Sequence, residues 1–177
     1  MSLAGKKIVL LTAPYFEESE VIYPLYRLRE EGAEVILSSV GERGNFMKGK
    51  NGLKISIAQP VQGLDFDTVH AVVVPGGFAP DSLRSNERVQ ALVHHVYSRG
   101  GIVAAICHGP WVLVSADLIR GKQCTSYISI KDDMFNAGGL WEDAPVVVAN
   151  RIITSRCPDD LPAFCKTIIS QVSKLTF

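Results

Sequence analysis

The residues with the clearest capacity for chemistry are Cys107 and His108, which are adjacent in the chain. They follow a continuously apolar run, 102–106, and precede Gly109 and Pro110, after which the sequence continues as a helix. This order predicts a sharp strand-to-helix turn that exposes the Cys107 side chain at the carboxyl edge of a sheet. A helix N-terminus offers free backbone N–H groups and partial positive charge, so we expect the thiol to ionise more easily than that of a free cysteine. Cys107 is therefore the predicted nucleophile.

A packing role is the alternative for Cys107, because cysteine is among the most often buried residues. The predicted turn favours the nucleophile. The other three cysteines, Cys124, Cys157 and Cys165, have no such setting and are predicted to pack in the interior. With no Cys-x-x-Cys pair, neither a zinc site nor a disulfide framework is indicated, and no metal is expected. We expect reduced thiols in a cytoplasmic protein.

A second candidate element is the pair Gly76 and Gly77, which follows the predicted strand 70–74. Glycine lets a backbone N–H group approach a reacting oxygen closely. Together with the N–H of His108, the N–H of Gly77 would form a two-donor oxyanion site, and Gly76 would line the pocket. An ordinary Gly-Gly turn is the alternative interpretation.

Three acidic residues, Glu17, Glu18 and Glu20, follow the first predicted strand. The carboxyl ends of parallel strands line one crevice, so this loop should face the loop that carries Cys107. Acidic residues in the first turn of a helix also complement its dipole. For Glu18 and Glu20 we expect no role beyond this complement to the helix dipole.

The elements that must position these residues are short β-branched strands alternating with segments of helical period. The predicted strands are 7–12, 34–39, 70–74, 102–106, a short strand at 123–127 and a hairpin of 146–149 with 152–155. The predicted helices are 19–31, 86–98, one from 109, a small one at 130–137 and 158–174, with an irregular or hairpin excursion at 40–60. The alternation predicts one α/β domain, residues 1–177, with a mostly parallel sheet and helices on both faces.

Composition sets limits on the partners. Lys+Arg and Asp+Glu balance at 18 each, so no overall field attracts nucleic acid or an anionic membrane surface. The apolar run 8–11 near the N-terminus is too short for a signal segment or a membrane span. These observations favour small-molecule or protein substrates in the cytoplasm.

Five motifs stand in an order that identifies a family. They are Phe16-Glu17-Glu18-Ser19-Glu20 with Ile22-Tyr23-Pro24, Pro75-Gly76-Gly77-x-Ala79-Pro80, Ile106-Cys107-His108-Gly109-Pro110, Lys131-Asp132-Asp133-Met134 with Asn136-Ala137-Gly138, and Ser155-Arg156-x-Pro158-x-Asp160-Leu161. Over nearly its whole length the chain resembles the ThiJ/PfpI family, within the class I glutamine amidotransferase-like superfamily.

The resemblance implies a flavodoxin-like doubly wound sandwich and assembly into dimers or larger homo-oligomers. It also implies a nucleophile at Cys107, with His108 beside it and Glu17 as the carboxylic acid that hydrogen-bonds the thiolate. Two neighbouring anions repel each other, so Glu17 would be protonated while Cys107 is ionised, and the two would titrate as a coupled pair.

The sequence departs from the family pattern at two positions. Members resembling PfpI complete a triad with a glutamate from a neighbouring subunit, and here that position is Asp81. The side chain is one methylene shorter, which weakens a peptidase assignment. Trp111 stands where several members have glutamine, and it either walls the pocket or packs.

Three functions remain open at this stage. The leading hypothesis is attack of the Cys107 thiolate on a reactive aldehyde such as methylglyoxal, or on a glycated group, which gives a hydroxy acid without any cofactor. His108 or Glu17 would shuttle the proton. The alternatives are an oligomeric intracellular cysteine peptidase and a redox-responsive or chaperone-like stress protein whose Cys107 is oxidised. Class I amidotransferases activate their cysteine with a separate histidine and glutamate near the C-terminal end of the domain. No histidine follows His108 here, so glutamine hydrolysis by such a triad is excluded within one chain.

Overall fold

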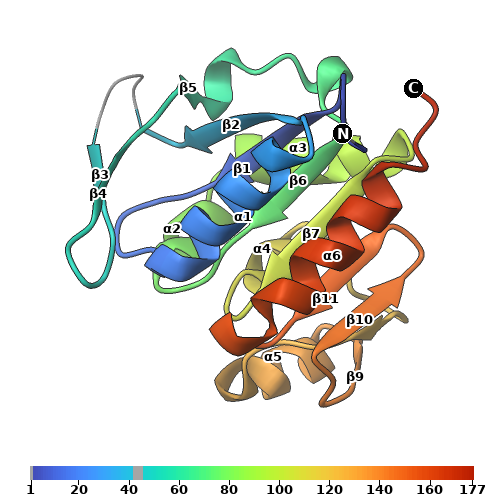
Figure 1. The fold of residues 1–177 in the computed structure, drawn as a ribbon. Coiled ribbons are helices and arrows are strands. Elements are labelled where there is room, and N and C mark those ends of the chain that lie inside the picture. The colour runs from blue at the N-terminus through green and yellow to red at the C-terminus, as the bar shows by residue number, and fades with distance from the viewer. Residues whose placement is uncertain (1, 42–45) are drawn as a thin grey trace.

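A computed structural model describes residues 2–41 and 46–177, and its centre is a seven-stranded sheet in the order β10-β11-β7-β6-β1-β2-β5 (Figure 1). The strands are β1 Lys7–Leu11, β2 Glu34–Ser39, β5 Gln59–Pro60, β6 Ala71–Val74, β7 Ile102–Ile106, β10 Val146–Ala149 and β11 Ile152–Ser155. All neighbours pair in parallel except β10 with β11. The order β2-β1-β6-β7-β11 is that of flavodoxin-like doubly wound sheets, so the predicted fold class is confirmed.

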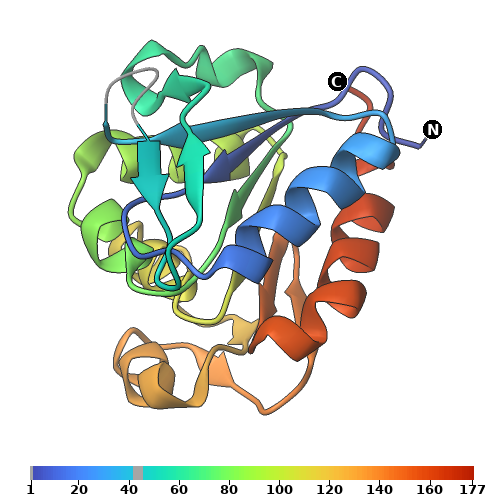
Figure 2. The ribbon, with the colours of Figure 1, turned by 60° about the vertical axis from the view of Figure 1, so that its left-hand side comes forward.

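Helices cover both faces of this sheet. Helices α1 (Glu18–Glu30) and α6 (Leu161–Val172) lie side by side on one face. Helices α2 (Ala79–Arg84), α3 (Glu87–Ser98) and α4 (Pro110–Ser115) lie on the other (Figures 1 and 2). The sandwich therefore has the three layers that the alternating pattern predicts.

Smaller elements surround the sandwich. They are the antiparallel hairpin β3 (Phe46–Lys48) with β4 (Lys54–Ser56), the parallel pair β8 (Gln123–Cys124) with β9 (Leu140–Trp141), and helix α5 (Lys131–Asn136). Four short 3-10 turns complete the list at Val61–Gly63, Phe66–Thr68, Ile128–Ile130 and Pro158–Asp160. The β3–β4 hairpin and α5 lie at different edges of the molecule (Figure 1).

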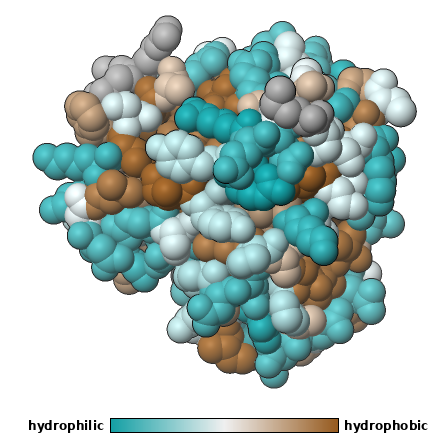
Figure 3. Space-filling model, viewed as in Figure 1, coloured by the Kyte–Doolittle hydropathy of each residue, from teal (hydrophilic) through white to brown (hydrophobic). Residues whose placement is uncertain are grey.

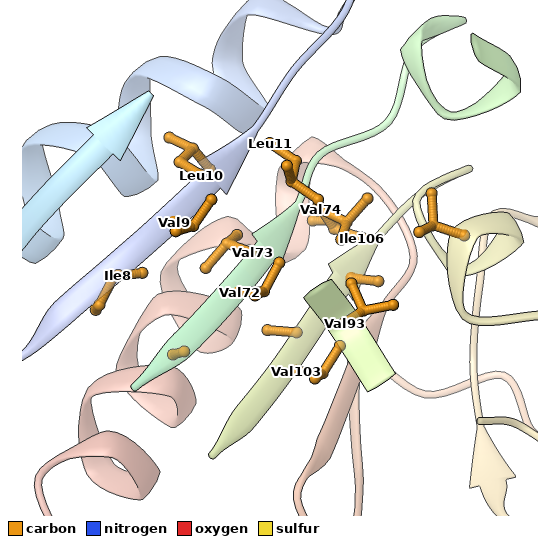
Figure 4. Close-up of a cluster of buried hydrophobic side chains, with 14 of the residues drawn as sticks. Ile8, Val9, Leu10, Leu11, Val72, Val73, Val74, Val93, Val103 and Ile106 are labelled. Carbon is orange, nitrogen blue, oxygen red and sulfur yellow. The ribbon is translucent and has the colours of Figure 1, made fainter. Parts of the chain in front are cut away.

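The core lies on both sides of the three central strands β1, β6 and β7. Their apolar residues alternate between the two faces, and both faces are covered by helices (Figure 4). Parallel strands buried in this way are apolar at successive positions, as Ala71–Val74 is. Helix α3 contributes the predicted stripe of Val89, Leu92, Val93 and Val96, all buried. Asn86 caps this helix by accepting from the N–H groups of its first turn.

Some boundaries differ from the prediction. The segment 75–81, which no predicted helix covers, ends in α2. Pro80 lies in the first turn of this helix, where its missing N–H costs no hydrogen bond. The predicted strand at 123–127 is only two residues long and pairs with β9 instead of joining the central sheet. The excursion at 40–60 contains the β3–β4 hairpin and β5, while its residues 42–45 lie outside the described part of the chain.

In residues 2–41 and 46–177, no helix has the length and apolar character needed to cross a bilayer. The face that carries α1 and α6 is largely hydrophilic, with hydrophobic areas separated by polar side chains (Figure 3).

A close backbone contact joins the loops that follow β1 and β6. Gly77 has φ +72°, and a bridge pairs it with Phe16. A Cβ atom on Gly77 would lie 2.6 Å from the carbonyl oxygen of Tyr15 and 2.7 Å from the carbonyl carbon of Phe16. Only glycine fits this position, because a side chain would meet fixed backbone as well as an unfavourable φ.

We predict that Gly77→Ala destabilises the protein more than Gly121→Ala does. Gly121 has a similar φ of +70° but open space around its Cβ position. Alanine there destabilises the protein only through its left-handed backbone conformation, by about 1–2 kcal/mol. At Gly77 the backbone overlap adds roughly 1–3 kcal/mol. Urea unfolding of both variants measures the difference. Equal losses would show that the two loops separate easily.

Candidate active site

Cys107 occupies the predicted sharp turn between β7 and α4. Its φ of +62° lies in the left-handed region, which is uncommon for a residue with a side chain. The Cys107 N–H donates to the Ser155 carbonyl at 3.0 Å, and its own carbonyl accepts from the Tyr127 N–H at 2.9 Å. These bonds hold the strained conformation. The thiol reaches the carboxyl edge of the sheet with only 8% of the residue exposed.

Three groups converge on Gly76, next to the thiol. A Cβ atom on Gly76 would lie 2.7 Å from the Cys107 Cβ, 2.8 Å from the Glu20 Oε2 and 2.9 Å from the His108 nitrogen. The backbone N–H groups of Gly77 and His108 act to lower the pKa of the thiol and so favour its anionic form. The two donors predicted for an oxyanion site are thus brought to one place.

Glu20 is the carboxyl group that adjoins the thiol. It is fully buried, and its Oε2 accepts from the Gly76 N–H at 2.6 Å. Its Oε1 has no hydrogen-bond partner among the described residues. Burial raises the pKa of Glu20 from its ordinary value of 4.5 to about 7.

The prediction that Glu17 hydrogen-bonds the thiolate is wrong, and so is the view that Glu20 only complements the helix dipole. Glu17 precedes α1, and its carboxylate pairs with Lys50 and accepts from the Ser19 hydroxyl at 2.9 Å. It therefore lies at the wall of the cavity. Glu20 lies inside the helix, in register with the buried Pro24 and Leu28 at i+4 and i+8. This helical register was the signal in the sequence that could have identified it.

His108 joins the thiol to a residue that the sequence did not reveal. Its Nδ1 lies 3.2 Å from the Cys107 Sγ, and its Nε2 lies 3.1 Å from the Ser129 Oγ. The ring stacks on Tyr127 and meets the Trp111 ring edge-on, with centroids 5.2 and 5.3 Å away. Burial, together with the charge of Lys50, lowers the pKa of His108, which favours a neutral imidazole.

Asp81 and Trp111 lie outside the cavity that the thiol faces. Asp81 is exposed in the first turn of α2 and is not among the His108 partners in the described part of the chain. Its contact across a subunit boundary stays a prediction. Trp111 donates from Nε1 to the Asp133 carboxylate at 2.8 Å, so it packs behind His108.

The cavity has a volume of about 420 Å³ and joins charged, aromatic and nucleophilic groups. Its lining residues are Glu17, Glu20, Lys50, Gly77, Phe78, Cys107, His108, Tyr127, Ser129 and Pro158. A larger, more open hollow of about 680 Å³ lies along α3 and includes His94 and His95, but it contains no cysteine. Across residues 2–41 and 46–177, no group of three or more His, Cys, Asp or Glu side chains is arranged to hold a metal ion.

The acidity of the thiol differs from the prediction. Burial and the adjoining charge of Glu20 raise the pKa of Cys107 to about 12. These effects outweigh the two backbone N–H groups and the short helix α4. Thiol and carboxyl are therefore a coupled pair in which one proton is readily lost and the second is held tightly.

We predict that Glu20→Gln moves ionisation of the Cys107 thiol to lower pH than the wild-type value of about 12. Glutamine still accepts from the Gly76 N–H but removes the negative charge that opposes the thiolate. Ultraviolet absorbance of the thiolate, corrected with Cys107→Ala, measures the change. Glu17→Gln is the matched control and should give a smaller shift. A Glu20→Gln midpoint at or above the wild-type one would contradict the predicted coupling.

Glu20 also predicts how stability depends on pH. Its pKa is about 7 in the folded protein, against an ordinary value of 4.5. As the pH rises, the unfolded chain therefore loses this proton at a lower pH than the folded protein does. The free energy of unfolding should then fall as pH rises from about 5 to about 8, by on the order of 3 kcal/mol. Glu20→Gln should lose this component, which urea unfolding at several pH values can measure. The same pH dependence in both proteins would place its origin elsewhere.

Comparisons with known proteins identify the family of the chain. The family model described as the DJ-1/PfpI family matches residues 6–171. The chain is 44% identical to Deglycase PH1704 of Pyrococcus horikoshii over 163 residues, which is 92% of this chain and 97% of the relative. It is 41% identical to Putative cysteine protease YraA of Bacillus subtilis over 160 residues, 90% of this chain and 94% of that protein.

A solved structure gives the same result for the fold. A two-domain protein from Anabaena variabilis, with DJ-1/ThiJ/PfpI-like and ferritin-like domains, superposes with a TM-score of 0.91 at 39% identity. The match covers 94% of this chain and 48% of that one. Because the family model matches residues 6–171, nearly the full length, the chain belongs to the DJ-1/PfpI family.

Proposed function

We propose that the protein is a cysteine-dependent enzyme that converts reactive 2-oxoaldehydes, or the adducts they form on amino groups, into hydroxy acids. One observation carries the proposal. The Cys107 sulfur faces a small cavity between a buried carboxyl group, an imidazole nitrogen and two backbone N–H donors. The similarity to proteins named deglycases supports the same reaction class.

The first step is formation of a carbon–sulfur bond. The thiolate attacks the aldehyde carbon, and the aldehyde oxygen takes a proton to give a hemithioacetal. On a glycated amine, the thiol displaces the amine from its carbinol and gives the same hemithioacetal. The N–H groups of Gly77 and His108 stabilise the developing oxyanion.

The second step moves a proton between carbon atoms. A base removes the proton from the carbon bonded to sulfur, and the neighbouring carbonyl carbon receives one, so the hemithioacetal becomes a thioester of a hydroxy acid. Glu20 suits this role because its pKa of about 7 lets it accept and return a proton near neutral pH. Water then cleaves the thioester, releases the hydroxy acid and restores the thiol. The sum is aldehyde plus water to hydroxy acid.

Peptide cleavage is the second candidate, and the similarity to Putative cysteine protease YraA supports it. It would use Cys107 as nucleophile and His108 as base, with Asp81 of a neighbouring subunit as the orienting group. Asp81 is exposed and therefore available for such a contact. The redox-responsive alternative stays a prediction.

We expect purified protein to consume methylglyoxal without glutathione and to release lactate, with turnover lost by roughly 10³-fold or more in Cys107→Ala. Cys157→Ser is the control, because that thiol does not line the cavity. Release of free amine from a methylglyoxal-treated amino acid tests the adduct reaction, and a peptide-substrate assay on the same samples tests the alternative. Absent or cysteine-independent lactate production would refute the proposal.

A further inference from the structure

Ser129 is a cavity residue whose hydroxyl contacts the imidazole of His108. Its Oγ lies 3.1 Å from the His108 Nε2, on the side of the ring opposite the sulfur, which lies 3.2 Å from Nδ1. The imidazole thus connects the thiol to this hydroxyl. Tyr127 and Trp111 hold the plane of the ring, but neither supplies a polar atom to Nε2.

The Ser129 hydroxyl can accept from Nε2–H or donate to an unprotonated Nε2, and the Cys107 thiol beside Nδ1 favours the first arrangement, because an S–H there donates to Nδ1. A neutral imidazole is a donor at one nitrogen and an acceptor at the other. When Nε2–H donates to the Ser129 Oγ, Nδ1 keeps its lone pair and faces the thiol as a base. After His108 takes the thiol proton, Nδ1–H faces the thiolate and Nε2–H still donates to Ser129. One hydroxyl therefore serves both protonation states.

Ser129 has little other structural role. It is exposed in the 3-10 turn Ile128–Ile130, and within the described part of the chain His108 is the one hydrogen-bond partner of its hydroxyl. Its removal should therefore leave the fold intact. Within one chain, the Nε2 of His108 is thus contacted by a neutral group.

We propose that Ser129 is a positioning residue that holds His108 in the Nε2–H tautomer, so that Nδ1 can accept the Cys107 proton. The inference rests on the proposed function, in which the Cys107 thiolate is the nucleophile. A serine in this position orients the base without the stabilisation of imidazolium that a carboxylate provides. Burial and the charge of Lys50 lower the pKa of His108, so it remains a weak base suited to brief proton transfer.

The test compares Ser129→Ala with Ser129→Thr, which keeps a hydroxyl, and with Ser170→Ala on the exposed surface of α6. Two readouts do not depend on turnover. Nitrogen NMR of labelled histidine, assigned with His108→Gln, reports the tautomer. Mass spectrometry follows alkylation of Cys107 by iodoacetamide against pH.

We expect Ser129→Ala to lose the Nε2–H tautomer preference and to slow alkylation at neutral pH by roughly five- to ten-fold, the size of one neutral hydrogen bond. Lactate production should fall by a similar factor in kcat, with KM unchanged. Ser129→Thr should recover to within about two-fold, and Ser170→Ala should match wild type. Wild-type tautomer and alkylation in Ser129→Ala would overturn the inference, whatever the turnover.

The two proposals fail separately. If Cys107→Ala abolishes turnover while Ser129→Ala keeps the wild-type tautomer and pH profile, the proposed function is supported and the proposed role of Ser129 is refuted. If no protein produces lactate, the proposed function fails, and the NMR and alkylation results still decide for or against Ser129.

Discussion

The left-handed backbone of Cys107 is the constraint on which the site depends. A non-glycine residue at φ +62° is unfavourable by itself, so the surrounding structure must maintain it. The hydrogen bonds to Ser155 and from Tyr127 do this, and both come from segments far along the chain. The conformation therefore depends on the end of β11 and on the segment that leads into the 3-10 turn Ile128–Ile130. In return, the thiol is presented to the cavity while the strand that carries it stays buried.

Electrostatics then limits what the buried groups can do. Cys107 and Glu20 share a space too small and too dry for two negative charges, so the pair releases one proton readily and holds the second tightly. The neutral imidazole of His108 adds a third proton-accepting group without adding charge. Lys50 is the cation of the cavity, and its pairing with Glu17 keeps a second carboxylate away from the thiol. The arrangement favours movement of single protons over permanent separation of charge.

The sequence predicted what depends on strong local patterns. The apolar run before Cys107 defined β7 and the nucleophile turn, and the spacing of Val89, Leu92 and Val96 defined α3. The prediction from the sequence failed where three-dimensional packing determines which side chains meet. The choice between Glu17 and Glu20 depended on which side of α1 faces the sheet, and neighbouring acidic residues concealed it. Ser129 reaches His108 only through tertiary structure, across about twenty residues with no periodic pattern.

The cavity is built from two kinds of structure. Cys107 and Glu20 belong to the central sandwich, whereas Lys50 comes from the turn of the β3–β4 hairpin, which forms a sheet of its own. The Lys50 N–H bond to the Phe16 carbonyl attaches the hairpin to the loop after β1, and Glu18, which accepts from Asn51, attaches it to the start of α1. Substitutions in the hairpin can thus change which molecules enter while the reacting atoms keep their positions. Because the charge of Lys50 also lowers the pKa of His108, a change at this one hairpin position would alter the imidazole as well as the cavity wall.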